Sequence, residues 1–340
     1  MVKMSTIEIL ITLSIPEEYL ERLQAVSPRV KLHTIPTHDP QDIPQELLAE
    51  IEILYTTDVF PDPADVPNLR WIQLHFAGVD HVVDRALFRE EIDITTLSGV
   101  AASGVAEYAL MGILALGRRV PRMMADMKQK RWPENRFKLY QPLALRGSTV
   151  GIVGYGSIGR EVARLCRAHG ATVLAAKHNL KQLDDKDYIL EGLGDPHADI
   201  PERIYPFQAV GSMASLCDFL VINVPLTPES RGLINDKVFS KMKTGAYLVD
   251  VSRGGVVDHG ALIEALQSGR LAGAALDVYP LEPLPERSPL WEMQNVILSP
   301  HIAGASANYY SQAMDLFAEN LKRYLAKKPL LNRYDPARGY

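Results

Sequence analysis

An apolar strand that runs into a glycine-rich turn and then a helix limits the possible folds of this sequence more than any other feature. Residues 150–153 are Val-Gly-Ile-Val, and Gly154-Tyr155-Gly156-Ser157-Ile158-Gly159 follows them. Gly154 permits a tight turn, Gly156 lets the backbone approach a pyrophosphate, and Gly159 allows the helix to pack closely on the strand. Backbone N–H groups at the helix N-terminus can then bind phosphates. The motif predicts a dinucleotide site; the alternative is a tight turn without a ligand.

Strand-like and helix-like segments alternate on both sides of this motif, a pattern typical of α/β folds with mostly parallel sheets. The 340 residues are enough for two domains. Before the motif we expect strands at 7–13, 30–33, 53–55 and 71–74, and helices at 16–25 and 44–50. From residue 149 we expect six strands, at 149–153, 171–176, 219–224, 246–251, 273–276 and 296–298, with helices at 158–169, 213–217, 235–242 and 259–268. Six strands with intervening helices indicate a Rossmann-type, doubly wound domain.

Three segments depart from this alternation. Residues 103–130 read as one long helix, and 306–326 as an amphipathic helix followed by a polar tail. Residues 179–207 are rich in Asp, Gly, Pro and Lys and are expected to form a long loop. Loops of that length in compact domains are usually functional or mobile, but the sequence assigns this one no role.

The helix expected at 103–130 carries more apolar side chains than one small domain needs. They are Met111, Leu114, Met123, Met124 and Met127. We therefore expect a homodimer with this helix at its interface. The alternative is that these side chains belong to the core of the same chain.

Charge and composition exclude several classes of protein. Thirty-six Lys and Arg against 41 Asp and Glu give a net charge of −5, which is not the basic balance of a dedicated nucleic-acid binder. The longest apolar helical stretch, 108–116, is too short to span a membrane, and residues 1–5 do not begin a signal-peptide core. Cys166 and Cys217 lie far apart outside any CxxC motif, so neither a disulfide framework nor a metal site is expected. Two isolated cysteines fit a protein of the reducing cytoplasm.

The end of the strand after the glycine-rich turn carries a cation instead of an acid. In NAD sites an Asp or Glu there usually binds the ribose hydroxyls. Here the strand ends in Lys177-His178-Asn179. A cation at this point suits the 2′-phosphate of NADP, so NADP(H) is favoured and NAD(H) is possible. The alternative is a solvated lysine at a strand end.

Three ionisable residues follow three successive strands of the second half. Arg253 follows the strand at 246–251, Glu282 the strand at 273–276, and His301 the strand at 296–298. A doubly wound sheet places its ligand crevice at the carboxyl ends of its strands. Taken singly, each residue also has a structural explanation: a cap or surface pair for Arg253, a solvated loop acid for Glu282, and a structural histidine for His301.

Together these three residues suit hydride transfer at a carbonyl group. A histidine can give a proton to the carbonyl oxygen as hydride reaches the carbon, and can take it back in reverse. A carboxylate beside it favours the imidazolium form and fixes the tautomer. A guanidinium can bind the carboxylate of the substrate through its fork of N–H donors and polarise the neighbouring carbonyl.

The sequence resembles the D-isomer-specific 2-hydroxyacid dehydrogenases over nearly its whole length. The motifs that carry the resemblance are Ala77-Gly78-Val79-Asp80, Val105-Ala106-Glu107, the glycine-rich turn, Val224-Pro225-Leu226-Thr227-Pro228, Ser252-Arg253-Gly254, Val257-Asp258, Asp277-Val278-Tyr279, Glu282-Pro283 and Ser299-Pro300-His301-Ile302-Ala303-Gly304. The resemblance implies a dimeric, two-domain α/β protein: a smaller, flavodoxin-like substrate-binding domain at 1–104 and 305–340, and an inserted NAD(P)-binding Rossmann domain at 105–304.

The same resemblance implies roles for individual residues. His301 is expected to be the acid/base, Glu282 its partner, and Arg253 the cation that binds the substrate. The backbone at Ala77, Gly78 and Val79 is expected to hold the substrate carboxylate. The expected cofactor contacts are Gly154, Gly156, Ser157, Ile158, Gly159, Lys177, His178, Val224, Pro225, Val251, Ser252, Arg253, Asp277, His301 and Gly304.

The expected substrate is a small 2-keto acid such as glyoxylate, hydroxypyruvate or pyruvate. Thr56 and Thr57 stand where related phosphoglycerate dehydrogenases carry a phosphate-binding arginine, so the substrate is expected to be unphosphorylated. Formate enzymes of this fold carry Gln beside the histidine, so Glu282 argues against that activity, while phosphite oxidation stays open. An alternative from another class is a dinucleotide-sensing interaction protein, because the family also resembles transcriptional corepressors of the same fold.

Overall fold

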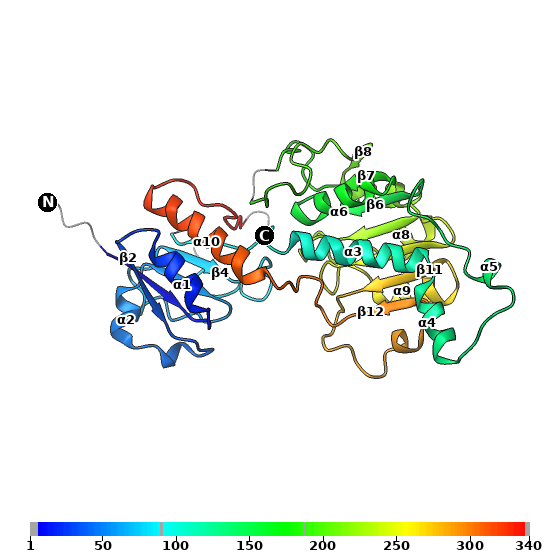
Figure 1. Ribbon diagram of the computed structural model, residues 1–340. Coiled ribbons are helices and arrows are strands. Elements are labelled where there is room, and N and C mark those ends of the chain that lie inside the picture. Colours follow the sequence, from blue (N-terminus) through cyan, green and yellow to red (C-terminus); the bar gives the residue numbers. More distant parts are fainter. Residues whose placement is uncertain (1–5, 89–90, 186–187, 337–340) are drawn as a thin grey trace. The chain divides into compact units, whose positions relative to one another are not determined.

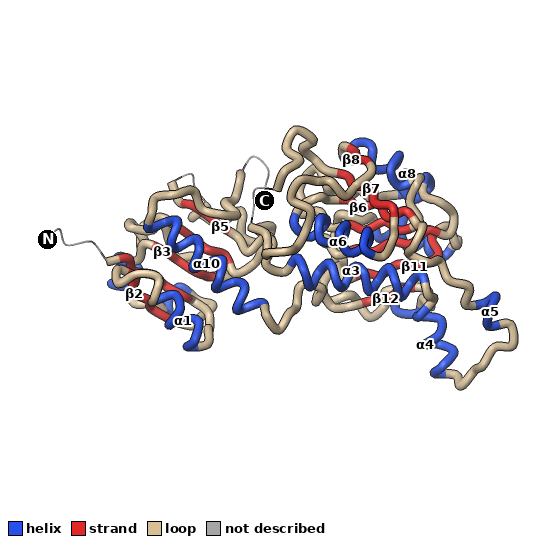
Figure 2. Tube along the Cα trace, turned by 45° about the horizontal axis from the view of Figure 1, so that its top comes forward, coloured by secondary structure: helices blue, strands red, loops and turns tan. Residues whose placement is uncertain are grey.

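The computed structural model describes residues 6–88, 91–185 and 188–336. The chain divides into two compact units (Figures 1 and 2). Unit 1 comprises Met1–Val100 and Ser306–Tyr340, and unit 2 comprises Ala101–Ala305. The sequence placed its boundaries at 104/105 and 304/305, and the assignment of substrate and cofactor to separate units stays a prediction. The expectation about residues 1–5 lies outside the described residues.

Unit 1 is built on a parallel sheet with the order β2-β1-β3-β4-β5. The strands are β1 (Ile7–Ile11), β2 (Val30–Thr34), β3 (Ile53–Thr56), β4 (Trp71–Leu74) and β5 (Asp93–Thr95). The helices are α1 (Glu17–Gln24), α2 (Gln45–Glu50), α10 (Tyr309–Leu325) and the short 3-10 helix η1 (Pro40–Asp42). This is the flavodoxin-like order, as predicted. The sequence missed β5, because three residues are too few to show an alternation.

Apolar side chains cover both faces of the unit 1 sheet. Successive residues of a strand point to opposite faces. On one face, Phe317 of α10 lies against the rings of Tyr55 and Trp71, with centroids 4.8 and 5.2 Å away. Helix α1 lies beside α10 on this face (Figure 1). On the other face, Leu48 of α2 packs in a cluster with Leu54 and its neighbours.

Unit 2 is built on a parallel sheet with the order β12-β11-β10-β9-β6-β7-β8. The strands are β6 (Thr149–Val153), β7 (Thr172–Ala176), β8 (Arg203–Tyr205), β9 (Phe219–Ile222), β10 (Ala246–Asp250), β11 (Leu271–Leu276) and β12 (Val296–Leu298). The predicted Rossmann-type order is confirmed, but the sheet has seven strands instead of six. Strand β8 pairs with β7 inside the segment expected to be a loop, and its three residues give no strand pattern.

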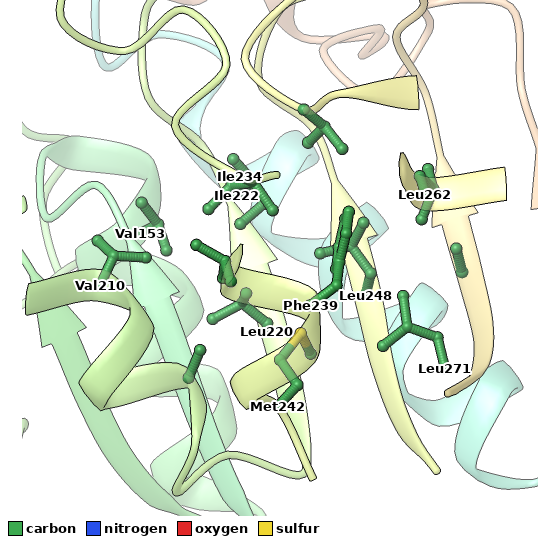
Figure 3. Packing of buried hydrophobic residues seen from close by; sticks show 14 of the residues in the cluster. Val153, Val210, Leu220, Ile222, Ile234, Phe239, Met242, Leu248, Leu262 and Leu271 are labelled. Carbon is green, nitrogen blue, oxygen red and sulfur yellow. The ribbon is translucent and has the colours of Figure 1, made fainter. Parts of the chain in front are cut away.

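Helices pack on both faces of the unit 2 sheet. The helices of this unit are α3 (Ala102–Gly117), α4 (Val120–Lys128), α5 (Arg136–Leu139), α6 (Ser157–Ala168), α7 (Val210–Ala214), α8 (Asp236–Lys241) and α9 (His259–Gln267), with the 3-10 helices η2 (Phe207–Ala209) and η3 (Pro289–Glu292), and not all of them lie on the sheet. Helices α3 and α6 cover one face. Helices α7, α8 and α9 cover the other, where Phe239 and Leu262 lie among Leu220, Ile222 and Leu248 (Figure 3). Because both faces are buried, the strands read as apolar runs.

The single helix expected at 103–130 is wrong. The chain forms α3 and α4 with a break between them, where Arg119 adopts a φ of 59°. Pro121 explains the break, because a proline inside a helix lacks the N–H donor and its ring clashes with the carbonyl four residues earlier. A proline in the first turn of a new helix has neither problem.

Candidate active site

The glycine-rich turn, residues 154–159, joins β6 to α6, and its backbone forms an open depression that we call the glycine cradle. Gly154 has a φ of 103°, a conformation that side chains rarely adopt. A Cβ atom on Gly159 would lie 2.0 Å from the Gly154 carbonyl oxygen, so the helix packs directly on the turn. A Cβ on Gly156 would meet no described atom within 4 Å, so this side of the turn is open. Since Gly156 also provides no side-chain cap to α6, the turn suits a bound pyrophosphate.

Strand β9 brings further residues to this cradle. Strands β6 and β9 are neighbours at the point where the strand order reverses, and ligands of such sheets bind there. A Cβ on Gly154 would lie 2.9 Å from Cγ1 of Val224, so the structure brings this predicted residue to the turn. Asn223 was missed, and its Nδ2 is buried without a hydrogen-bond partner among the described residues. Its place directly after a buried strand was the only sequence signal.

Lys177 lies at the end of β7 and contacts the glycine-rich turn. Its Nζ donates to the carbonyl oxygen of Tyr155 over 3.1 Å, and its side chain is half-buried. The next residue, His178, pairs through Nε2 with Glu229 over 2.7 Å. A cation is thus held at the corner of the cradle where NAD sites place an acid.

The segment that follows Lys177 is tied to the cradle by buried polar groups. The Arg160 side chain of α6 is 1% exposed and donates to the carbonyl oxygens of Asp195 and Leu183. Its guanidinium lies 5.0 Å from the centre of the Tyr155 ring, and the Tyr155 hydroxyl donates to Asp195 over 2.5 Å. Glu161 accepts a hydrogen bond from the Gly194 N–H at 2.7 Å. The described part of this segment is therefore held in place beside the glycine-rich turn.

His301 and Glu282 form a close pair. The Nδ1 atom of His301 lies 2.8 Å from Oε2 of Glu282, and the two side chains are 43% and 35% exposed. The other carboxylate oxygen of Glu282 accepts the backbone N–H of Tyr279 at 3.0 Å. The sequence therefore located two residues, 19 positions apart, that the fold brings into contact.

Arg253 follows β10 in a turn that packs against the segment after β11. Its Nη1 donates to the carbonyl oxygen of Ser252 at 2.9 Å, and the side chain is half-buried. A Cβ on Gly254 would lie 1.8 Å from the Tyr279 carbonyl oxygen, so only glycine fits there. The turn of Arg253 is therefore fixed against the residues that lead to Glu282.

Asp277, Val251 and Ser252 are predicted cofactor residues that the structure places inside the protein, with exposures of 1%, 7% and 3%. Asp277 binds the backbone of the turn after β12, and Ser252 donates to Asp250 through its N–H and its hydroxyl. A Cβ on Gly304 would make ordinary contacts with Ala101 and Val105. Their contact with a cofactor stays a prediction.

The residues predicted to hold the substrate carboxylate lie in unit 1, after β4. Ala77 is exposed, Gly78 is half-buried, and Val79 is buried in the core with an exposure of 3%. Only the first two therefore present their surface to solvent. They follow His75 and Phe76, whose rings lie 5.7 Å apart.

The similarity of the chain to known proteins decides its family. Residues 110–303 match the NAD binding domain of the D-isomer specific 2-hydroxyacid dehydrogenases. A glyoxylate reductase from Thermofilum pendens is 33% identical over 326 residues, which cover 92% of this chain and 90% of the relative. The chain belongs to the D-isomer specific 2-hydroxyacid dehydrogenase family. As a member, it is an NAD(P)-dependent oxidoreductase that transfers hydride between a nicotinamide cofactor and a 2-keto or 2-hydroxy acid.

Solved structures of 2-hydroxyacid dehydrogenases share the whole fold. One from Xanthobacter autotrophicus Py2, in complex with NADPH and MES, is 30% identical with a TM-score of 0.79, covering 99% of this chain and 100% of that one. An NADPH-dependent glyoxylate/hydroxypyruvate reductase from Sinorhizobium meliloti, in complex with NADP and sulfate, is 25% identical with a TM-score of 0.77, covering 98% and 100%.

None of the helices in the described part of this dehydrogenase is both long enough and apolar enough to cross a membrane. Within residues 6–88, 91–185 and 188–336, no three His, Cys, Asp or Glu side chains gather in a way that could hold a metal ion.

Asp250 is a buried acid that sequence reasoning missed. It ends β10, three residues before Arg253, and is 0% exposed. Its Oδ1 accepts the N–H and the hydroxyl of Ser252, while Oδ2 has no hydrogen-bond partner among the described residues. Burial raises the pKa of Asp250 to about 7, and the hydrogen bonds from Ser252 only partly offset this.

Asp250→Asn should stabilise this dehydrogenase much more at pH 8 than at pH 5. Because its pKa is raised, the folded protein keeps a proton that the unfolded chain loses above about pH 4, so stability falls as the pH rises toward 7. An asparagine cannot ionise. At pH 8 we expect about 2–4 kcal/mol of added stability and a Tm higher by several degrees. Calorimetry at both pH values checks this, with Asp184→Asn, whose side chain is 66% exposed, as the control. An equal gain at both pH values would contradict the electrostatic cause.

Proposed function

We propose that this dehydrogenase reduces a small, unphosphorylated 2-keto acid of the glyoxylate, hydroxypyruvate or pyruvate type, and prefers NADPH to NADH. The observation that carries the proposal is the His301–Glu282 pair at 2.8 Å, on the same unit as the open glycine cradle. The Thermofilum pendens relative is a glyoxylate reductase, and the Xanthobacter autotrophicus neighbour binds NADPH, which supports both halves of the proposal.

In this proposal His301 is the acid/base. Nδ1 is engaged by Glu282, so Nε2 is the nitrogen that exchanges a proton with the substrate oxygen. Glu282 is itself oriented by the Tyr279 N–H, so it fixes the direction and the tautomer of the imidazole. Arg253 binds the substrate carboxylate and polarises the carbonyl group. The backbone of Ala77 and Gly78 is also proposed to bind the substrate, whereas Val79, predicted with them, is buried in the core of unit 1 with an exposure of 3%.

The cofactor is proposed to lie on the glycine cradle, where it supplies the hydride when bound. Gly154, Gly156, Ser157, Ile158 and Gly159 hold the pyrophosphate, and Val224 and Pro225 border it from β9. Lys177 and His178 bind the 2′-phosphate. The further proposed contacts are Val251, Ser252, Arg253, Asp277, His301 and Gly304.

The absence of a phosphate group on the substrate is supported by the end of β3. Thr56 is 0% exposed, and its hydroxyl accepts hydrogen bonds from the Thr12 hydroxyl at 2.8 Å and the Val59 N–H at 3.0 Å. Thr57 donates to Asp58 at 2.7 Å. A hydroxyl engaged in the core and an adjacent acid do not favour a substrate phosphate.

Steady-state kinetics on a panel of 2-keto acids, with NADH and NADPH in parallel, test the proposed function. We expect turnover of at least one unphosphorylated 2-keto acid and a higher kcat/KM with NADPH. Dinucleotide binding without turnover of any 2-keto acid would overturn the proposal and favour the sensor alternative. Formate and phosphite with NADP⁺ belong in the same panel.

We expect a homodimer with α3, α4 and α5 at its interface. Exposed apolar side chains gather there: Met111, Leu114, Val120, Met123, Met124, Met127, Trp132 and Phe137. These side chains are 36–82% exposed, and so many exposed apolar residues in one part of the sequence are typical of an interface. Sedimentation at micromolar concentration should give a dimer, and Met124→Glu with Met127→Glu should shift it to monomer. Monomer alone in the unmodified protein would refute this.

A reducing, cytoplasmic location is also proposed. Cys166 and Cys217 are free and buried, and burial raises the pKa of both thiols to about 12. Free, inert thiols are typical of proteins that work where disulfides do not form.

A further inference from the structure

His301 has a backbone conformation that needs support from its surroundings. Its φ is 55°, in the left-handed region that residues other than glycine rarely adopt. Such a conformation is strained and persists only where the neighbouring structure holds it. The imidazole is also 43% exposed, so packing alone does not fix it.

Asp277 holds the chain on the C-terminal side of His301. Its Oδ1 accepts the N–H of Ile302 and its Oδ2 the N–H of Ala303, both at 2.8 Å. On the N-terminal side, the hydroxyl of Tyr279 donates to the Ser299 carbonyl oxygen at 2.9 Å. The turn that carries His301 is therefore held at both ends by side chains of the residues that follow β11.

A chain of hydroxyl groups extends from Asp277 to helix α3. The Ser299 hydroxyl donates to Oδ1 of Asp277 at 2.5 Å. The Tyr108 hydroxyl is hydrogen-bonded to the same Ser299 oxygen. Since Ser299 has one proton and gives it to the carboxylate, Tyr108 must be the donor to Ser299. Burial raises the pKa of Tyr108, so it remains a phenol, and therefore a donor, across the physiological range.

We infer that Ser299 and Tyr108 are positioning residues for the acid/base His301. They donate in series, Tyr108 to Ser299 and Ser299 to Asp277, and so hold the carboxylate that pins the His301 turn. Neither touches the reacting atoms. The inference rests on the proposed role of His301, and it assigns a function to two side chains outside the predicted site.

The order of the three groups suits this role. Asp277 is 1% exposed and accepts three hydrogen bonds from the turn, so its carboxylate must keep one orientation. A charge-assisted hydrogen bond from Ser299 fixes one oxygen of the Asp277 carboxylate. Because the Tyr108 phenol donates to the Ser299 hydroxyl, it polarises that hydroxyl and strengthens the bond from Ser299 to Asp277. Helix α3 also lies against the turn, because a Cβ on Gly104 would be 3.6 Å from the Ala303 carbonyl oxygen. Rotation of Asp277 would move His301 relative to its substrate.

The test compares Ser299→Ala and Tyr108→Phe with Ser299→Thr, which keeps the hydroxyl. The control is Tyr324→Phe, which removes another part-buried phenol that donates to a carboxylate, Glu52, at 2.5 Å in unit 1. We expect kcat to fall about tenfold in Ser299→Ala and about threefold in Tyr108→Phe, because misplacement of a catalytic group slows the chemical step. The KM for NADPH should stay within about twofold, Ser299→Thr should recover most of kcat, and Tyr324→Phe should leave kcat unchanged.

Amide hydrogen exchange without substrate gives a second measurement. In Ser299→Ala the N–H groups of Ile302 and Ala303 should exchange at least about tenfold faster, while the N–H of Asp277, which donates to the backbone carbonyl oxygen of Asp250 at 3.0 Å, keeps its rate. Unchanged exchange at Ile302 and Ala303 in a folded Ser299→Ala protein, or an unchanged kcat, would overturn the inference. If the unmodified protein reduces no 2-keto acid, the proposed function fails, and the exchange rates alone still decide whether Ser299 holds the turn.

Discussion

His301→Gln is expected to lower kcat about 10²–10⁴-fold, the usual contribution of general acid–base catalysis. Glutamine can still donate a hydrogen bond to a carbonyl oxygen, but it cannot deliver a proton to the alkoxide that hydride transfer generates. Stopped-flow measurement of cofactor oxidation, at saturating 2-keto acid and NADPH, separates this chemical step from binding. His197→Gln is the control, because His197 also faces an acid, Asp184 at 3.3 Å, but its side chain is 75% exposed. A near-normal kcat in His301→Gln would refute the assignment.

Glu282→Gln is the second arm of this prediction. Glu282 acts only through the imidazole, to which it is joined at 2.8 Å, so its removal should cost little once His301 is gone. The double variant should therefore be close to His301→Gln alone, far from the product of the two single effects. Multiplicative effects would show that Glu282 and His301 act independently.

Lys177→Asp is expected to invert or erase the preference for NADPH. The ammonium group of Lys177 carries three donors and is held at the cradle by the Tyr155 carbonyl oxygen at 3.1 Å. A charge-assisted hydrogen bond to a 2′-phosphate contributes about 1.5–3 kcal/mol, or roughly tenfold to a hundredfold in affinity. An aspartate would repel that phosphate and accept hydrogen bonds from the ribose hydroxyls of NADH.

We expect kcat/KM for NADPH to exceed that for NADH by about one to two decades in the unmodified enzyme, and the ratio to fall by at least as much in Lys177→Asp. The kcat at saturating cofactor should stay largely intact, because Lys177 lies away from the His301 pair. Lys181→Asp makes the same charge change at an exposed site four residues later and should leave the ratio unchanged. A preference of the unmodified enzyme for NADH would show that Lys177 only ends its strand.

The parts of the fold that depend on local pattern could be predicted from the sequence. Strands buried on both faces are continuous apolar runs, and β4 and β6 have the bounds expected from them. The part-buried β12 also has its expected bounds. The positions of the candidate site followed from the same pattern, because parallel strands deliver the residues after their carboxyl ends to one edge. This is why Glu282 and His301 could be paired before any coordinates were known.

The parts that depend on short elements or distant contacts could not be predicted. Strands β5 and β8 have three residues each, too few for a pattern. The motif around Asp277 predicted only a contact with the cofactor. Its hydrogen bonds to the N–H groups of Ile302 and Ala303 join residues 25 and 26 positions away, which no local pattern in the sequence shows. The break between α3 and α4 at Arg119 did have a local signal in the sequence, because Pro121 disfavours a continuous helix there.

The buried guanidinium of Arg160 joins the segment after Lys177 to helix α6, so neither can be changed alone. Two of its N–H groups donate to the carbonyl oxygens of Asp195 and Leu183, and its Nε forms an ion pair with the Asp185 carboxylate at 3.2 Å. These partners all belong to that segment. A shorter connection grafted from a relative would leave a charge enclosed in apolar surroundings, which proteins do not tolerate. Loop and arginine must therefore be exchanged together, and protein engineers who shorten the one should replace the other with an apolar side chain.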